Sequence, residues 1–452
     1  MPAAVLWLRR DLRLGDHPAL LAAADEGGPV VALFVLDEAL RKPSGAPRVA
    51  FLYRTLRALD GKLRASGGGL VVRRGKPEDV VPAVAREAGA SSVHVSADFA
   101  PYGAARDGRV EAALGDTPLV RTGSPYAVAP GRVTKGDGSP FTVYSAFYRA
   151  WADHGWRAPA ASRPGGVDWR TLDGTGIPKD PSLPRGTNLP EAGEDAALAA
   201  WRTFRRAHLP GYGTDRDRPD RDRTSRMSPY LKFGSIHPRT ILADLGPGDS
   251  GYRREIAWRE FYAAVLHFWP ESAREYFQPA MARMPYGTGR AADEALAAWT
   301  AGRTGFPIVD AGMRQLLAEG WMHNRVRMIV ASFLVKDLHV EWTHGARHFM
   351  RHLVDGDVAS NQHNWQWVAG TGTDAAPYFR IFNPVTQGGR FDPGGAYIRR
   401  WVPELAGLKG RDVHEPWRRH GGLPDGYPER IVDHGRERSR TLADFKALRA
   451  RS

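Results

Sequence analysis

The sequence predicts an α/β domain built on a doubly wound parallel sheet, followed by an all-helical domain. Up to about residue 122, short apolar runs alternate with helical patterns, which is typical of a parallel sheet with helices on both faces. Beyond about residue 196 the strand signals vanish and helical periodicity takes over. The chain has 452 residues, which is enough for two or three domains with separate cores.

The strands and helices of the first domain follow one another in strict alternation. Helical patterns separate the expected strands, and the amphipathic helix at 48–67 ends in glycine. This order predicts a Rossmann-like domain over residues 1–125. No G-x-G-x-x-G follows the first strand, so we do not expect the usual dinucleotide site there. The expected strands are 3–8, 29–37, 70–75, 91–98 and 118–122, and the helices are 19–26, 48–67, 77–89 and 107–114.

A stretch without clear periodicity separates the two domains. Residues 158–195 are rich in Pro, Gly, Ser and Asp, as expected of a linker or a surface loop. We place the linker at 126–195 and the helical domain at 196–452. Helical periodicity is clear in EDAALAAWRTFRRAHL, YRREIAWREFYAAVLHFW, DEALAAWTAG, VDAGMRQLLAEG and RVRMIVASFLVKDLHV.

Composition narrows the functional classes. The chain has no cysteine, which excludes disulfides, thiol catalysis and thiolate metal sites. It has no apolar run long enough to span a membrane and no signal-peptide pattern, so we expect a cytoplasmic protein. The formal charge of +13 favours a polyanionic partner, nucleic acid first. An arginine-rich genomic composition explains the charge equally well.

Residues 321–384 carry the densest mixture of polar and aromatic side chains. The segments are WMHNRVRM (321–328), DGDVASNQHNWQW (355–367) and TDAAPYFRIFNP (373–384). A hydrolase would need only the polar groups, and a plain core only the aromatic ones. Their combination indicates a site that holds a polar, planar cofactor and exchanges electrons with it.

The segment 211–234 is a candidate phosphate site. It alternates Asp and Arg and then offers Thr224, Ser225 and Ser228 ahead of an apolar helix. Hydroxyls and free N–H groups at a helix start suit a phosphate or a diphosphate. An ordinary capped helix after a charged loop gives the same pattern.

One predicted helix presents a mixed face. Glu255, Trp258, Arg259 and Tyr262 lie at i, i+3, i+4 and i+7 and therefore share a side of the helix. A carboxylate, an indole and a guanidinium together can stack on and hydrogen-bond a base. A buried aromatic residue beside an intrahelical Glu–Arg pair is the structural alternative.

A histidine row invites a metal interpretation that the pattern does not support. His344, His348 and His352 lie at i, i+4 and i+8, but no Glu-x-x-His accompanies them and arginines intervene. We expect no metal. Nearby, Asp355 and Asp357 form either an acid/base pair or a set of hydrogen-bonding groups for the edge of a heterocycle.

Taken together, these segments resemble the photolyase/cryptochrome family, and more closely its class I cyclobutane pyrimidine dimer (deoxyribodipyrimidine) photolyases. The similarity runs from residue 7 to about residue 384, and VHEPW (413–417) continues it. Any one string is suggestive, whereas all of them in order are very specific. The matching strings are WLRRDLRLGDHPAL, TSRMSPYLKFG, EIAWREFY, GRTGFPIVDAGMRQLLAEGWMHNRVRMIVASFLVKDL, LVDGDVASNQHNWQW and TGTDAAPYFRIFNP.

The resemblance implies light-driven repair of DNA. In this family a helical domain holds flavin adenine dinucleotide (FAD), which passes an electron to a pyrimidine dimer and splits its cyclobutane ring. The dimer must leave the duplex to reach the pocket. Asn361 is implied to face flavin N5, with Arg327 as the partner of Asp355. The implied flavin contacts are Tyr212, Thr224, Ser225, Arg226, Met227, Ser228, Tyr252, Arg327, Asp355, Gly356, Asp357 and Asn361.

The resemblance also implies the contacts to damaged DNA. Glu255 and Asn324 are suited to bond the pyrimidine edges, Trp258 and Trp367 to form an apolar wall, and Arg325 to meet a phosphate. With Asn361 these make up the residues implied in catalysis, and the partner is DNA that contains pyrimidine dimers. The full set of implied DNA contacts is Arg216, Glu255, Trp258, Arg259, Tyr262, Asn324, Arg325, Met328 and Trp367.

Two positions depart from the family pattern. Trp365 and Trp342 match the inner and middle tryptophans of the photoreduction chain, but the interval 286–298 contains no outer tryptophan, and Tyr286 is its nearest aromatic residue. Gly103 stands where folate-binding relatives have a carboxylate. We therefore expect 8-hydroxy-5-deazaflavin as the antenna chromophore, with a reduced folate as the alternative.

A second functional class within the same family is a cryptochrome-type blue-light receptor without repair activity. Plant-type receptors tend to have Asp where Asn361 stands. The (6-4) photolyases have a His pair in the region where this chain has Asn324 and Met328. Both comparisons favour the dimer photolyase, acting as a monomer.

Overall fold

The computed structural model describes residues 1–161, 166–374 and 380–450. They form two compact units between which the chain passes several times. Unit 1 comprises Met1–Ser182, Pro190–Pro210 and Ser225–Pro270, and unit 2 comprises Leu183–Leu189, Gly211–Thr224 and Glu271–Ser452. The boundaries 1–125, 126–195 and 196–452 drawn from the sequence stay a prediction for the functional domains.

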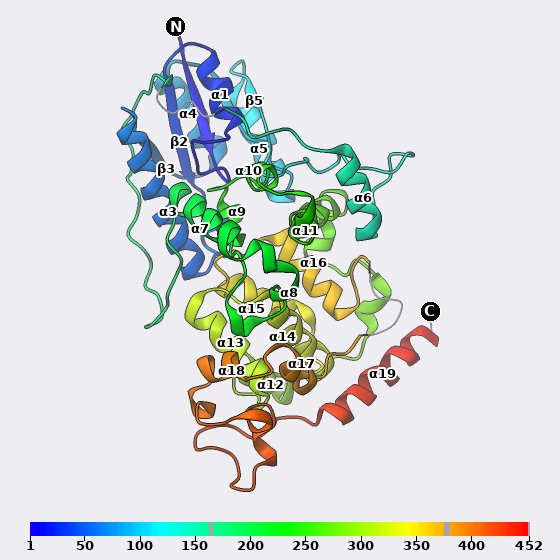
Figure 1. Cartoon of the computed structure of the whole chain (residues 1–452). Helices are drawn as coiled ribbons and strands as arrows, with labels where there is room; N and C mark the ends of the chain where they lie inside the picture. Colours follow the sequence, from blue (N-terminus) through cyan, green and yellow to red (C-terminus); the bar gives the residue numbers. More distant parts are fainter. Residues whose placement is uncertain (162–165, 375–379, 451–452) are drawn as a thin grey trace. The chain divides into compact units, whose positions relative to one another are not determined.

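Unit 1 contains a five-stranded parallel sheet in the order β3-β2-β1-β4-β5 (Figure 1). Its strands are almost wholly apolar, because a parallel sheet buries both faces. The predicted α/β fold class is confirmed, and each expected strand is present with ends that differ by at most three residues. The strands are β1 Ala3–Leu8, β2 Val30–Leu36, β3 Leu70–Arg74, β4 Ala90–Val95 and β5 Leu119–Arg121.

The helices of unit 1 include one that the sequence pattern missed. α6, Tyr144–His154, lies in the expected linker and buries Tyr144, Phe147 and Trp151 at helical spacing. α5 also begins six residues before its expected start, because Pro101 at its first position favours the helix. The others are α1 Pro18–Asp25, α2 Glu38–Arg41, α3 Ala46–Ala65, α4 Pro77–Ala88, α7 Glu194–Ala207, α9 Ser228–Phe233, α10 Pro238–Ala243 and α11 Ser250–Phe268.

The described residues of unit 2 form helices joined by loops, with no strand among them, as predicted for the C-terminal part. A core of tryptophan, phenylalanine and aliphatic side chains lies among α13 to α16, and Trp299 and Trp342 are fully buried in it. The helices are α8 Tyr212–Asp215, α12 Arg290–Thr300, α13 Pro307–Glu319, α14 Asn324–Lys336, α15 Trp342–His352, α16 Val358–Ala369, α17 Pro384–Phe391, α18 Ala396–Trp401 and α19 His434–Ala450.

Short 3-10 helices complete the chain, at Leu209–Gly211, Pro219–Arg221, Pro247–Asp249, Pro270–Ala273, Pro279–Arg283, Pro403–Leu405, Gly410–Val413 and Pro416–Arg418. Across the described ranges, no helix combines the length and the apolar character needed to cross a bilayer. Five residues of the TGTDAAPYFRIFNP string, 375–379, lie outside the described residues.

Candidate functional site

Asp355 is the most restrained of the predicted cofactor residues. It lies between α15 and α16, and its Oδ2 accepts a hydrogen bond from Arg327 Nη2 at 2.8 Å. Arg327 is itself oriented by a bond from its Nε to the Met322 carbonyl. The other carboxylate oxygen, Oδ1, is buried and accepts no hydrogen bond from the described residues. One oxygen is thus held by the protein, and the other is left for a ligand donor.

Asp357 and Asn361 place two further polar groups at the start of α16. Asp357 caps the helix, accepting from the Ser360 N–H at 3.2 Å. Asn361 is 8% exposed, and its Nδ2 donates to the Ala346 carbonyl and to Gln362 Oε1. Because an amide nitrogen has only two hydrogens, the remaining hydrogen-bonding capacity of Asn361 lies in its Oδ1 acceptor.

The loop before α9 shows why Asp and Arg alternate there. Asp215 is buried and accepts from Arg221 and Arg223 at 2.5 and 3.1 Å, so the loop folds around one carboxylate. At the end of this loop, the Thr224 hydroxyl is buried and has no hydrogen-bond partner among the described residues. Tyr212, at the start of α8, lies 5.8 Å from the guanidinium of Arg216.

Within unit 1, the predicted flavin contacts around Ser225 form a small hydrogen-bonded group. The Tyr252 hydroxyl donates to Ser225 Oγ at 2.8 Å, and the Met227 N–H donates to the same oxygen at 3.4 Å. Burial raises the pKa of Tyr252. Arg226 has a φ of 49°, a left-handed conformation that a side chain other than glycine adopts only at a cost. Ser228 begins α9 and is exposed.

The predicted face of α11 divides into two kinds of residue. Trp258 stacks on Tyr144 of α6 with ring centroids 3.5 Å apart. Arg259 donates to two backbone carbonyls, and Tyr262 is 3% exposed. Arg259 and Tyr262 therefore stabilise the packing of unit 1. Their contact with DNA, like that of Trp258 and Glu255, stays a prediction.

Glu260, on the same helix, escaped the sequence reasoning. It is buried and accepts hydrogen bonds from Trp151 Nε1 and the Val128 N–H at 2.6 and 3.0 Å. Burial raises its pKa to about 6. Trp151, which donates to Glu260, belongs to α6. Because the sequence pattern did not predict α6, it could not predict this contact of Glu260 either.

The lesion contacts predicted in unit 2 are less uniform. Asn324 begins α14 and is exposed, whereas Met328 and Trp367 are half-buried against the core. Arg325 is held by Asp217 at 2.8 Å and lies over the Phe391 ring. Its Nε and Nη2 both donate to that carboxylate, so Nη1 is the nitrogen left to meet a phosphate.

The two predicted electron-transfer tryptophans lie on adjacent helices. The ring edge of Trp365 lies against Gly345 of α15, where an added Cβ would come within 2.2 Å of Cη2. Trp342 precedes Gly345 by three residues on the same helix. The ring of Tyr276 lies edge-on to Trp342 with centroids 5.9 Å apart, and the role of Tyr286 as the outer member stays a prediction. Sequence reasoning missed Tyr276 because no spacing links it to α15.

The histidine row has a structural explanation. The rings of His348 and His352 lie 4.5 Å apart, and His348 lies edge-on to Trp299. Burial lowers the pKa of His348 to about 3. Among the described residues, no group of three His, Asp or Glu side chains is placed to hold a metal ion.

A buried cluster of charges occupies the carboxyl ends of β1 and β4, where the winding of the sheet reverses. Arg9 and Arg106 bond Asp107 at 2.6 and 2.8 Å, and Arg106 also reaches Asp98 at 3.2 Å. A Cβ at Gly103 would lie 2.1 Å from Asp98 Oδ2. Position 103 is therefore glycine because the Asp98 carboxylate fills its space. Ligands of open α/β sheets bind at such a reversal.

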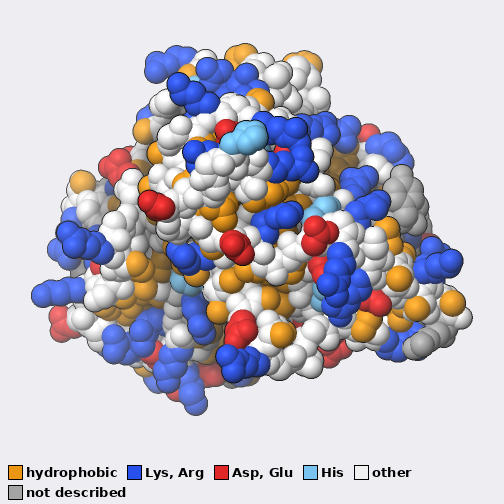
Figure 2. Space-filling model, turned by 90° about the horizontal axis from the view of Figure 1, so that it is seen from below, with side chains coloured by type: hydrophobic (Ala, Val, Ile, Leu, Met, Phe, Trp, Pro, Cys, Tyr) orange, Lys and Arg blue, Asp and Glu red, His pale blue; other side chains and the backbone are white. Residues whose placement is uncertain are grey.

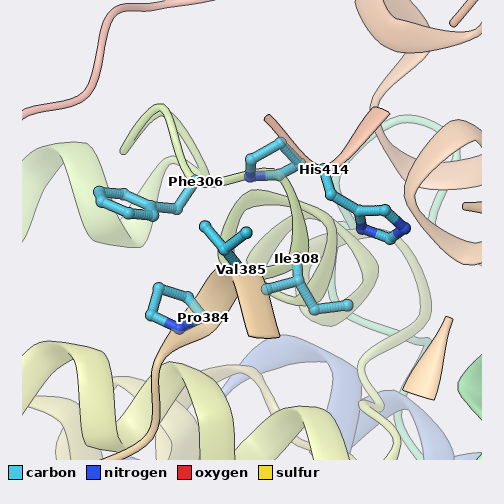
Figure 3. Close-up of a pocket in the computed structure, with 6 residues that line it drawn as sticks. Phe306, Ile308, Pro384, Val385 and His414 are labelled. Atoms are coloured by element: carbon cyan, nitrogen blue, oxygen red, sulfur yellow. The ribbon is translucent and has the colours of Figure 1, made fainter. Parts of the chain in front are cut away.

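A small pocket in unit 2 lies away from the predicted site residues. Figure 3 shows Phe306, Ile308, Pro384, Val385 and His414 around it, and its empty volume is about 170 Å³. It is lined mainly by apolar groups and is too small for a dinucleotide. Figure 2 shows Lys and Arg side chains spread over one face of the molecule, with hydrophobic and acidic side chains between them.

The residues present fit a flavin dinucleotide in chemical terms. Two of the predicted flavin contacts in unit 2, Asp355 and Thr224, each have a buried oxygen (Oδ1 and Oγ1) without a hydrogen-bond partner among the described residues. An unsatisfied buried acceptor costs about 1–3 kcal/mol, which a bound polar ligand recovers. Hydroxyl, carboxylate and amide groups are the partners that a ribityl chain and a heterocycle edge require.

Comparison with known proteins agrees with this chemistry. The family described as DNA photolyase matches residues 4–164, and the FAD-binding domain of DNA photolyase matches residues 252–447. The deoxyribodipyrimidine photo-lyase of Streptomyces griseus is 42% identical, over 97% of this chain and 98% of its own length. That of Halobacterium salinarum is 40% identical, over 98% and 99%.

Solved structures show the same fold. A class III photolyase from Agrobacterium tumefaciens superimposes with a TM-score of 0.90 at 36% identity, over 100% of this chain and 98% of that one. A cryptochrome from Synechocystis gives a TM-score of 0.87 at 26% identity, over 98% of each chain. The chain therefore belongs to the DNA photolyase family, with its α/β domain and its helical FAD-binding domain.

Proposed function

We propose that this protein is a light-driven enzyme that splits cyclobutane pyrimidine dimers in DNA. The single observation that carries the proposal is the Arg327–Asp355 pair, in which Asp355 Oδ1 is buried without a partner among the described residues. Full-length similarity to curated deoxyribodipyrimidine photo-lyases supports the activity. Bound FAD would supply the light absorption and the transferred electron.

The chain's own residues bind, orient and shield. Asp355, Asp357 and Asn361 hold the flavin ring and ribityl chain, and Thr224 to Ser228 with Tyr212 and Tyr252 hold the rest of the cofactor. Glu255 and Asn324 bond the pyrimidine edges, while Trp258, Met328 and Trp367 exclude water from the dimer. No acid/base or covalent step by a side chain is needed, so placement is the protein's contribution.

We assign the protein to class I on the strength of the TSRMSPYLKFG and WMHNRVRM strings, and we expect a monomer. A solved relative is a class III enzyme, so the class is a finer question than the activity. Repair assays on a thymine dimer in single-stranded DNA and in duplex DNA would define the substrate range.

For the antenna we propose 8-hydroxy-5-deazaflavin, held at the reversal point between β1 and β4. Gly103 supplies no carboxylate, and Asp98 fills the space beside it. A relative from Sulfolobus tokodaii carries two FAD molecules, so a second flavin competes with a folate as the alternative. When the purified protein is mixed with each chromophore in turn, only the deazaflavin should bind and add its near-visible absorption to the spectrum.

A cryptochrome-type receptor without repair activity is the second candidate, supported by the similarity to the Synechocystis cryptochrome. The deciding experiment uses purified, flavin-loaded protein and an oligonucleotide with one thymine dimer. Repair under blue light and none in the dark supports the photolyase. Bound flavin with no repair in either condition supports the receptor.

A further inference from the structure

Tyr276 is the aromatic residue that continues the row from Trp342 toward the surface. Its ring lies edge-on to Trp342, with centroids 5.9 Å apart and planes at 85°. Trp342 is fully buried, whereas Tyr276 is only partly buried. The two residues come from distant parts of the sequence, so the contact is a product of the fold of unit 2.

The Tyr276 hydroxyl has a carboxylate partner. It donates a hydrogen bond to Glu341 Oε1 at 2.9 Å. A tyrosine has one hydroxyl hydrogen and a carboxylate only accepts. The Tyr276 hydroxyl hydrogen is therefore directed at Glu341. The second oxygen of Glu341 accepts from Thr343 at 2.9 Å, which keeps the carboxylate in place.

The tryptophans of the row lack such a proton acceptor. The indole N–H groups of Trp365 and Trp342 are buried and make no hydrogen bond to the described residues. An oxidised indole at either position therefore keeps its proton and remains a strong oxidant. Proton transfer requires a base within about 2.6–3.2 Å, and among the described residues such a base is present at Tyr276 and absent at both tryptophans.

A second branch from Trp365 ends inside the core. Trp299 lies edge-on to Trp365 with centroids 6.1 Å apart, and its N–H donates to the Val330 carbonyl. Phe349 and His348 cover it, and its exposed fraction is 0%. A carbonyl is a poor base, and a buried indole is out of reach of reductants. An oxidised Trp299 would therefore have neither a base for its proton nor access to a reductant in solution.

We propose that Tyr276 is the outer electron donor of the photoreduction row and that Glu341 receives its proton. Tyr276 gives one electron to oxidised Trp342 and its hydroxyl proton to Glu341, which leaves a neutral tyrosyl radical and a protonated carboxyl. A thiolate in solution then returns one electron to Tyr276, while the proton moves back from Glu341. The proposal rests on the proposed function, because that function places an electron acceptor beside Trp365.

Flash photolysis of the flavin-loaded protein with a paramagnetic resonance readout tests this donor. Wild-type protein should show a neutral tyrosyl radical after the flash. Tyr276→Phe keeps the ring contact and removes the proton, so the tyrosyl signal should vanish. Trp342 then stays oxidised, and the yield of reduced flavin should fall at least about tenfold. Glu341→Gln should delay the tyrosyl signal.

Matched variants keep the test decisive. Tyr397→Phe removes another buried hydroxyl of unit 2, bonded to Gln315, and should leave the radical signal unchanged. Flavin content and circular dichroism check that each variant folds. An unchanged signal in Tyr276→Phe would overturn the proposal, as would its loss in Tyr286→Phe alone or a wild-type signal from tryptophan only.

Failure of the underlying function is recognised separately. With flavin reduced beforehand by dithionite, repair needs no electron from the row, so Tyr276→Phe should repair thymine dimers at the wild-type rate. If reduced wild-type protein repairs nothing, the proposed function fails. The radical measurement then still decides between Tyr276 and the tryptophans.

Discussion

Two buried groups of charges differ in how far the protein itself completes them. At the ends of β1 and β4, no side chain of the Arg9, Asp98, Arg106 and Asp107 cluster is more than 9% exposed. In unit 2, Arg327 is 25% exposed beside Asp355, whose Oδ1 has no partner among the described residues. Asp107 also leaves one oxygen unbonded, but inside a closed cluster.

The difference indicates what each region needs from a ligand. A closed cluster of two arginines and two aspartates is a folded structure in its own right, so an antenna would bind against it. The Asp355 group keeps an open side and an unsatisfied oxygen, which costs about 1–3 kcal/mol until a ligand donor meets it. FAD binding should therefore depend on single residues more strongly than antenna binding does.

Asp355→Asn should produce the largest effect. The Asn side chain has no negative charge to pair with Arg327. It also replaces one of the two carboxylate oxygens with an NH₂ group, which alters the acceptor that we expect a flavin donor to use. Flavin bound per protein should fall at least about tenfold, which corresponds to about 1.4 kcal/mol. Absorption of the purified protein measures it.

Glu404→Gln is the control for this variant, because Glu404 forms a partly buried pair with Arg314 at 2.6 Å in the same unit. It should keep its flavin. Equal flavin loss in both variants would mean that general destabilisation, not a specific contact, explains the result.

Glu255→Ala should affect the lesion and not the cofactor. Losing a hydrogen bond from a charged group costs about 1.5–3 kcal/mol, so affinity for an oligonucleotide with a thymine dimer should fall about tenfold or more. Flavin content should not change. Glu294→Ala, an exposed position on α12, serves as the control. Loss of flavin from Glu255→Ala would show that Glu255 belongs to the cofactor site.

Gly103→Ala tests whether the sheet cluster is closed. The new methyl would lie 2.1 Å from Asp98 Oδ2, so the cluster must shift, at a cost of about 1–3 kcal/mol. Flavin should stay bound. Gly108→Ala on the same helix meets no atom within 4 Å and should stabilise the protein by about 1 kcal/mol. Thermal melts compare the two, and equal melting temperatures would contradict the closed cluster.

Lys336 should give the smallest effect, on the pH dependence of stability. It is 2% exposed, and burial lowers its pKa to about 7. Between pH 7 and 10.5 the unfolded chain then binds more protons than the folded one, so stability rises with pH. From pH 7 to 9 the melting temperature should rise by about 1–2 °C relative to Lys336→Met. Parallel pH profiles would contradict this shift.

The sequence predicted the fold from local patterns but not the contacts that join distant segments. The strands were placed to within three residues because buried parallel strands are continuous apolar runs. α6 was missed, because its apolar spacing lies next to a Pro- and Gly-rich stretch. Roles that depend on packing, such as Asp98 against Gly103, left no signal in the sequence.

The candidate site followed the same division. The motifs identified Asp355 and Asn361 by resemblance, and the Arg327 pairing is present in the structure. They could not identify Tyr276 or Glu260, whose partners lie far along the chain. Arg325 and Arg259 were predicted to meet DNA by resemblance to the family, and each is held by partners within its own unit.

The most direct test of the account is repair of a single thymine dimer by the purified, flavin-loaded protein with its flavin reduced. Conversion of the dimer to two thymines is followed by chromatography under blue light and in the dark. Conversion should occur only under light, and Glu255→Ala should lower it. Flavin-loaded protein that leaves the dimer intact under light would contradict the account.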